Sequence, residues 1–246
     1  RDLVSAGSVR QVGLHEDRVS VDLRLGYHLA DKGAALADAV KARLESEAGI
    51  DTASVNVSSK VMPHKVQEDL KPLDSIANII AVGSGKGGVG KSTTAVNLAL
   101  ALAAEGASVG VLDADIYGPS QPMMLGITGH PESADGQSME PMEGHGLQVM
   151  SIGFLVNHDG AMIWRGPMAT QALEQLLRQT NWKDLDYLII DMPPGTGDIQ
   201  LTLSQRVPMT GAVIVTTPQD IALLDAKKGI KMFEKVGVPI LGIVEN

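Results

Sequence analysis

The amino-acid sequence predicts an α/β protein in which a small α+β domain precedes a larger, doubly wound domain with a mostly parallel sheet. After residue 75, continuous apolar runs alternate with helical segments, whereas the first 61 residues alternate single apolar and polar positions. Parallel strands covered by helices on both faces give continuous apolar runs, and half-buried strands give alternation. The 246 residues, 44% of them hydrophobic, suffice for one sizeable core and a smaller neighbour.

The predicted small domain covers residues 1–61. Residues 19–25 alternate apolar and polar side chains, which is the period of a half-buried strand. Between residues 33 and 49, apolar residues recur every four positions in Ala-rich sequence and are bounded by glycines, which indicates an amphipathic helix. A second alternating strand begins near residue 55. These elements are typical of a small α+β unit.

The predicted larger domain covers residues 76–246 and follows a linker at residues 62–75. The linker is polar and contains two prolines, which disfavour regular secondary structure. Beyond it, residues 126–146 are rich in Gly, Pro, Ser and acidic residues and are expected to form a mobile surface loop. The expected strands of this domain are residues 79–82, 109–112, 187–190, 213–215 and 240–244, and the expected helices are residues 91–104, 168–178 and 220–236.

A glycine-rich segment between the first strand and first helix of this domain predicts a phosphate-binding loop. Its sequence, GSGKGGVGKST at residues 83–93, satisfies the pattern G-x-x-x-x-G-K-[ST] in the required strand-to-helix context. Successive backbone amides and the helix N-terminus then face phosphate oxygens. The predicted nucleotide-binding residues of the loop are Gly85, Lys86, Gly87, Gly88, Val89, Gly90, Lys91, Ser92 and Thr93.

Two residues of this loop have distinct predicted tasks. Lys91 is expected to neutralise the β- and γ-phosphate charge as a catalytic residue, and the Ser92 hydroxyl is expected to bind Mg²⁺. A dinucleotide pattern, G-x-G-x-x-G, overlaps the same segment. The Lys-Ser pair at the start of the helix favours a mononucleotide such as ATP instead.

Acidic residues follow two predicted strands, where nucleotide hydrolysis requires them. Asp113 and Asp115 come after the strand at 109–112, and their period-two spacing directs both carboxylates to the same side if the strand extends that far. Asp191 ends the strand at 187–190 and precedes a Pro-Pro-Gly turn. We expect Asp191 to hold Mg²⁺ through water and the Gly195 amide to sense the γ-phosphate.

Composition excludes several classes of function. The net charge of −9 and pI near 5.1 argue against nucleic acid as the main partner. No apolar run approaches the roughly 20 residues of a membrane span, and no signal peptide opens the chain, so we expect a cytoplasmic protein that does not engage a membrane. The chain contains no cysteine, which excludes disulfides and thiolate metal ligands within it. Because it starts at Arg1 and stops after an apolar run, we expect a fragment.

Four sequence strings resemble the Mrp/ApbC family, relatives of MinD and ParA that act as ATP-dependent carriers of iron-sulfur clusters. The strings are KGGVGKST at residues 86–93, DIYGPS at 115–120, WRGPM at 164–168 and DMPPGTGD at 191–198. The resemblance covers most of the chain, and residues 1–61 are similar to the small domain that precedes the ATPase in bacterial members. It implies a slow ATPase that works as a homodimer and transfers clusters to apo iron-sulfur proteins.

The resemblance also implies roles for single residues. Lys86 is expected to reach across the dimer to the partner's phosphates, Asp113 to lie near Mg²⁺, and Asp115 to orient the attacking water. Asn246 stands where the family contacts the adenine base; the alternative is the start of an N-K-x-D guanine signature. The family holds its cluster on a C-x-x-C pair shortly after this asparagine, so the cluster ligands are not in this chain.

Two other classes of function remain open at this point. A MinD- or ParA-like positioning switch predicts an amphipathic C-terminal helix or a basic face, and the visible charge pattern provides neither. A scaffold or chaperone that binds nucleotide without turnover predicts tight binding with no phosphate release.

Overall fold

A computed structural model describes residues 2–155 and 166–246. The chain divides into two compact units, one comprising residues up to Met62 together with Ala104–Ala107, and the other comprising Pro63–Ala103 and Ser108–Asn246. Each unit has its own sheet. Within the described residues, no helix is long and apolar enough to cross a membrane.

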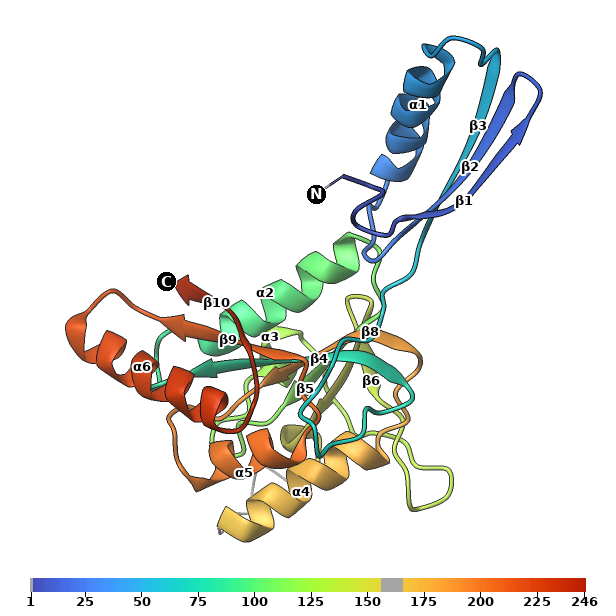
Figure 1. Ribbon diagram of the computed structural model, residues 1–246. Coiled ribbons are helices and arrows are strands. Elements are labelled where there is room, and N and C mark those ends of the chain that lie inside the picture. Colours follow the sequence, from blue (N-terminus) through green and yellow to red (C-terminus); the bar gives the residue numbers. More distant parts are fainter. Residues whose placement is uncertain (1, 156–165) are drawn as a thin grey trace. The chain divides into compact units, whose positions relative to one another are not determined.

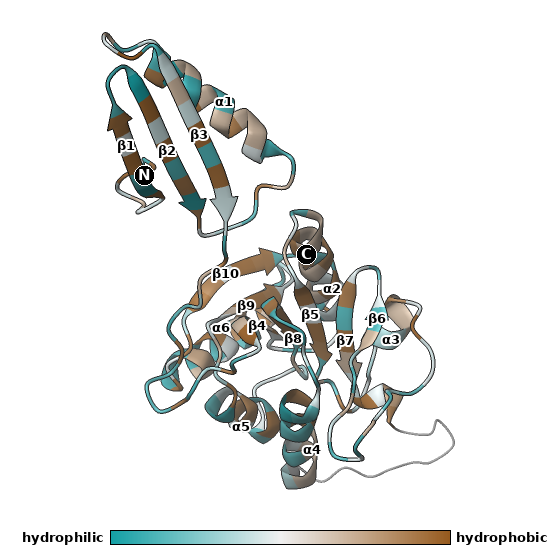
Figure 2. Cartoon of the chain, turned by 90° about the vertical axis from the view of Figure 1, so that its right-hand side faces the viewer, coloured by the Kyte–Doolittle hydropathy of each residue, from teal (hydrophilic) through white to brown (hydrophobic). Residues whose placement is uncertain are grey.

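The first unit is a three-stranded sheet covered by one helix. Its elements are β1 (Val9–His15), β2 (Arg18–Leu25), α1 (Lys32–Glu45) and β3 (Thr52–Ser59). β2 lies in the centre, antiparallel to β1 and parallel to β3. Apolar and polar residues alternate along β2 (Figure 2), and the buried set packs against Val40 and Leu44 of α1. The strands predicted at 19–25 and near residue 55 are therefore present as β2 and β3, while β1 had no sequence prediction. The predicted helix is α1, which ends at Glu45 and not at the glycine at residue 49.

The second unit contains a seven-stranded sheet of order β10-β9-β4-β8-β5-β7-β6. All neighbouring pairs are parallel except β6 with β7, which confirms the predicted mostly parallel architecture. Helix α2 covers one face of this sheet and α4, α5 and α6 cover the other (Figure 1). The strands are β4 (Ile76–Ser84), β5 (Val109–Asp113), β6 (Met142–Gly144), β7 (Leu147–Ser151), β8 (Leu185–Asp191), β9 (Gly211–Thr216) and β10 (Ile240–Glu245), and the helices are α2 (Lys91–Ala104), α3 (Gln121–Met124), η1 (Ile152–Phe154), α4 (Gly166–Gln179), α5 (Asp198–Arg206) and α6 (Asp220–Lys235).

Continuous apolar runs form the central strands because both faces of the sheet are covered. The consecutive residues Leu188, Ile189 and Ile190 of β8 are all buried, although their side chains point alternately to opposite faces. Sequence periodicity did not identify β6, β7, α3 or α5, which are short or polar. The segment 126–146, predicted as a surface loop, contains β6 near its end.

Of the predicted linker at residues 62–75, all but Met62 belong to the second unit. The Gln67 side chain donates from Nε2 to the carbonyls of Ser204 (2.9 Å) and Val207 (3.2 Å), and its Oε1 accepts from the Met209 amide (3.0 Å). These three bonds satisfy backbone groups at the C-terminus of α5 and in the turn before β9. The segment is therefore fixed to the body of this unit by a side chain.

Replacing Gln67 by methionine tests the contribution of this contact. Gln67→Met preserves the volume but removes the three bonds of this side chain. The Ser204 carbonyl loses the Gln67 donor, whereas the Met209 amide and the Val207 carbonyl keep the bond between them (2.9 Å). We expect the free energy of unfolding of the second unit to fall by about 1–3 kcal/mol. Urea denaturation followed by circular dichroism measures the change. Gln171→Met, at an exposed position of α4, is the matched control and should leave the midpoint unchanged; equal midpoints for the two variants would contradict the assignment.

Candidate nucleotide site

The ends of three parallel strands meet at one edge of the seven-stranded sheet. β4 runs into the loop at residues 85–90, which leads directly into α2. Asp113 at the end of β5 pairs in register with Asp191 at the end of β8, and β8 also lies beside β4. The glycine-rich loop and the two acidic strand ends, separated by up to about a hundred residues in the sequence, therefore share one site.

Glycine is required in the loop for two separate reasons. Gly88 and Gly90 have φ angles of 76° and 85°, a left-handed conformation that residues with a Cβ adopt only at a cost. At Gly85, a Cβ would collide with the backbone of Asp225 in α6, and at Gly90 it would collide with the side-chain amide of Asn246. The loop is thus held tightly between α6 and the end of β10.

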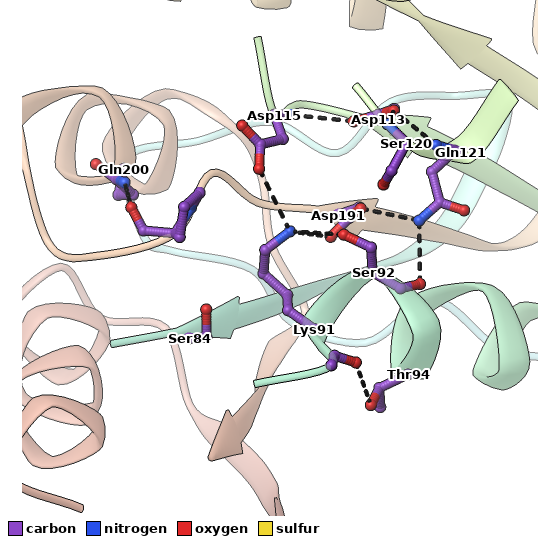
Figure 3. Close-up of polar contacts among 12 residues, drawn as sticks. Ser84, Lys91, Ser92, Thr94, Asp113, Asp115, Ser120, Gln121, Asp191 and Gln200 are labelled. Atoms are coloured by element: carbon purple, nitrogen blue, oxygen red, sulfur yellow. Dashed lines mark hydrogen bonds and ion pairs between the residues drawn. The ribbon is translucent and has the colours of Figure 1, made fainter. Parts of the chain in front are cut away.

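The Lys91 ammonium lies among three oxygen-bearing side chains, as Figure 3 shows. It is only 6% exposed and pairs with Asp191 Oδ1. Its Nζ donates to Ser92 Oγ over 3.1 Å and lies 3.9 Å from Asp115 Oδ2. The structure therefore brings together four of the residues selected from the sequence.

Asp113 is fully buried, and its carboxylate is surrounded by donors from the following segment. Oδ2 accepts from the amides of Ser120 (2.9 Å) and Gln121 (3.0 Å) and from Ser151 Oγ (3.2 Å), while Oδ1 accepts from the Asp115 amide (3.1 Å). Burial, together with the neighbouring charge of Asp191, raises the pKa of Asp113 to about 7, although the amide donors oppose the shift. Asp113 thus organises the turn that follows β5.

The strand predicted at 109–112 is β5, which ends at Asp113, so the condition that it extends to Asp115 is not met. The chain turns at this point since the Asp113 carboxylate binds the amides that follow it. The turn nevertheless places the Asp115 carboxylate beside Lys91. Burial raises the pKa of Asp115, and the Lys91 charge partly offsets this effect.

The remaining predicted residues surround this centre. The Gly195 amide donates to the Ser84 carbonyl (2.8 Å), and Asn246 Nδ2 donates to the Val89 carbonyl (3.1 Å), so Asn246 lies against the loop. Lys86 is half-buried and Thr93 is exposed. Of the string at 164–168, Trp164 and Arg165 lie outside the described residues.

Sequence reasoning missed Gln121. This residue is fully buried at the start of α3, and its Nε2 donates to Asp191 Oδ2 (2.8 Å) and to the Ser92 carbonyl (3.1 Å). Its only sequence signal is its position six residues after Asp115 in a Pro-containing segment, which does not reveal a contact across 70 residues.

The oxygen donors of the site fit a magnesium ion that also binds nucleotide phosphates. Ser92, Asp113 and Asp191 provide only hard oxygen ligands, and a cationic group, Lys91, is already stabilised among such oxygens. Over residues 2–155 and 166–246, no group of three or more His, Cys, Asp or Glu side chains is arranged to hold a metal. A cation bound by few carboxylates plus phosphate is the arrangement that Mg²⁺ favours.

Comparison with known proteins agrees with this geometry. The model of the ParA-type family described as NUBPL iron-transfer P-loop NTPase matches residues 75–246. The chain belongs to this family. The iron-sulfur cluster carrier protein of Escherichia coli K12 is 55% identical over 246 residues, which is 100% of this chain and 67% of that protein.

Solved structures show a similar fold. The nucleotide-binding protein of Archaeoglobus fulgidus, in complex with ADP, is 44% identical with a TM-score of 0.62 and covers 71% of this chain and 68% of that one. The cell-division ATPase MinD of Pyrococcus furiosus has a TM-score of 0.52 at 24% identity, over 69% of this chain and 71% of that one, and supports the fold alone.

Gly90→Ala tests the close approach between the loop and Asn246. The added methyl group meets the Asn246 amide in a left-handed backbone, so the Asn246 side chain must leave the loop or the loop must shift. We expect nucleotide affinity to fall at least tenfold, equivalent to about 1.4 kcal/mol. Gly136→Ala is the control, because Gly136 also has positive φ (69°) but no atom near its Cβ position. Calorimetric titration with ADP measures the nucleotide affinity of both variants. Equal affinities for Gly90→Ala and Gly136→Ala would disprove the steric argument.

Asp113→Asn is expected to remove a pH dependence from the stability. Because the pKa of Asp113 is about 7 in the folded protein and an unfolded aspartate titrates near pH 4, the folded state retains a proton that the unfolded state loses between these values. The stability that Asp113 contributes is therefore complete below about pH 4 and declines as the pH rises toward 7. Urea denaturation in EDTA without nucleotide should show the wild type losing stability relative to the variant between pH 5 and pH 8. A difference that stays constant over this range would contradict the prediction.

Proposed function

We propose that this chain is the ATP-hydrolysing part of an iron-sulfur cluster carrier, in which the nucleotide state controls whether a cluster is held or transferred. The observation that carries the proposal is the enclosure of the Lys91 ammonium by Asp191, Ser92 and Asp115 at the base of a complete phosphate-binding loop. The names of the E. coli relative and of the matching family support cluster carriage.

In this proposal the loop residues Gly85–Thr93 bind the phosphates through backbone amides and the N-terminus of α2. Lys91 leaves Asp191 and neutralises the β- and γ-phosphates, which frees Asp191 Oδ1. Ser92 would hold Mg²⁺ directly, and Asp113 and Asp191 would hold it through water; when bound, the ion neutralises charge on the phosphate oxygens. The ADP complex of the 44% identical relative supports an adenine nucleotide. Asn246 is the proposed contact to the adenine base.

Hydrolysis requires a water aimed at the γ-phosphate and a signal that the phosphate is present. Asp115 lies next to Lys91 and is the proposed residue that orients this water. Lys86 acts across a homodimer on the phosphates of the other subunit. The Gly195 amide, now bonded to the Ser84 carbonyl, exchanges that acceptor for the γ-phosphate, which couples the nucleotide to the start of α5 (Asp198).

The cluster is cargo in this scheme, and its thiolate ligands lie outside these 246 residues because the chain has no cysteine. The recipients are apo iron-sulfur proteins. The acidic composition supports the absence of a nucleic-acid partner. A cytoplasmic location without a membrane partner belongs to the same proposal.

Two lysine variants separate binding from turnover. Lys91→Ala removes the ammonium inside the loop and leaves Asp191 buried without its cationic partner, so we expect ATP hydrolysis to fall by a factor of 100 or more. Lys86→Ala should keep ATP affinity within about threefold while hydrolysis falls at least tenfold, because Lys86 acts on the partner's nucleotide. Phosphate release and fluorescent-nucleotide titration measure the two quantities. Full activity in both variants would refute the site assignment.

Cluster carriage is tested by anaerobic reconstitution of the whole gene product that contains these residues. We expect iron and sulfide to bind in equal amounts per dimer and to transfer to an apo-ferredoxin at a rate that changes at least tenfold on adding ATP. Lys91→Ala should load a cluster but lose the ATP response. Absence of bound iron with and without ATP would leave only a nucleotide switch.

A further inference from the structure

Gln121 contacts all three residues that are predicted to hold Mg²⁺. Its backbone amide donates to Asp113 Oδ2 (3.0 Å), and its side-chain Nε2 donates both to Asp191 Oδ2 (2.8 Å) and to the carbonyl of Ser92 (3.1 Å). Figure 3 shows the amide nitrogen turned toward Asp191 and Ser92. With 0% exposure, the side chain has no access to water.

The two oxygens of Asp191 have different partners. Oδ1 pairs with the Lys91 ammonium, whereas Oδ2 accepts from Gln121. Lysine is a flexible point charge that must turn to the phosphates when nucleotide binds, but both Nε2 hydrogens of Gln121 remain engaged. After Lys91 leaves, Gln121 therefore still fixes the Asp191 carboxylate with Oδ1 free.

A neutral amide is suited to this task. An arginine or lysine in its place would also hold the carboxylate, but its positive charge would oppose a second cation at the same oxygens. The glutamine also lowers the stability of the folded state, because among the described residues its Oε1 is buried without a hydrogen-bond partner. A buried oxygen without a hydrogen bond lowers the free energy of unfolding by about 1–3 kcal/mol. Stability alone therefore does not favour an amide at this position.

We infer that Gln121 is a positioning residue that keeps Asp191 and Ser92 in place for Mg²⁺, and so sets the Mg²⁺ affinity of the nucleotide complex. The inference rests on the proposed function and deepens it, since it concerns the metal dependence of the same site. Outer residues that orient metal ligands change metal affinity or activity by about 10–100-fold when they are replaced.

Gln121→Met, which keeps the volume and removes the donor, is the direct test. Binding of a fluorescent ATP analogue is titrated in EDTA and at increasing Mg²⁺ concentrations, which requires no turnover. We expect affinity in EDTA within about twofold of the wild type, and a half-saturating Mg²⁺ concentration raised about tenfold or more. Gln121→Asn is one methylene too short to span Asp191 and Ser92, and it should also raise the half-saturating Mg²⁺ concentration. This variant replaces Gln121→Met in the test if the methionine variant does not fold.

Gln67→Met is the matched control. It removes a glutamine with the same number of side-chain donations to the second unit, so it lowers stability but should leave the Mg²⁺ dependence unchanged. A Gln121 variant with wild-type Mg²⁺ dependence, or an equal shift in Gln67→Met, would overturn the inference. If the wild type binds ATP with Mg²⁺ but does not hydrolyse it, the proposed function fails while this test still decides the role of Gln121.

Discussion

The ion pair between the buried Lys91 ammonium and the Asp191 carboxylate is the interaction on which the rest of the site depends. Asp191 and Asp113 lie opposite each other on neighbouring strands, and both are fully buried. Two carboxylates so close in a weakly polar interior are tolerated only with a cation or a proton nearby. Lys91 supplies the cation beside Asp191, and burial together with the charge of Asp191 raises the pKa of Asp113 to about 7. The site is therefore prepared for additional positive charge.

This arrangement gives nucleotide binding a physical consequence. A lysine that moves to phosphate oxygens leaves an uncompensated buried carboxylate, which costs about 3–5 kcal/mol in comparable cases. A divalent cation that arrives with the nucleotide restores the balance, so nucleotide and metal bind most favourably together. Gln121 contributes a neutral contact that persists through the exchange.

The backbone around the site links it to the rest of the second unit. Gly85 packs against the backbone of α6, Gly195 is bonded to the end of β4, and α5 begins three residues after Gly195. At the other end of α5, Gln67 bonds the carbonyls of Ser204 and Val207. The segment after Met62 is thus attached to the C-terminal end of α5, at the opposite end of this helix from Gly195.

The sequence by itself determined the phosphate-binding loop, the parallel sheet and the acidic strand ends. These features depend on local constraints: glycines at positive φ, a Lys-Ser pair at a helix start, and apolar runs long enough for buried strands. The motifs were therefore sufficient to predict the family of this chain from its sequence. Whether β5 extends to Asp115 could not be predicted, because the strand ends where the carboxylate of Asp113 binds amides that come later in the sequence.

Only the tertiary structure decided how these pieces contact one another. Gln121 reaches Asp191 across 70 residues, Lys91 reaches it across 100, and Asn246 reaches Val89 across 157. No local pattern encodes such contacts, because they follow from the order of strands in the sheet and from the packing of α6 against the loop. The sequence thus specified which chemical groups are present, and the strand order brought their charges together.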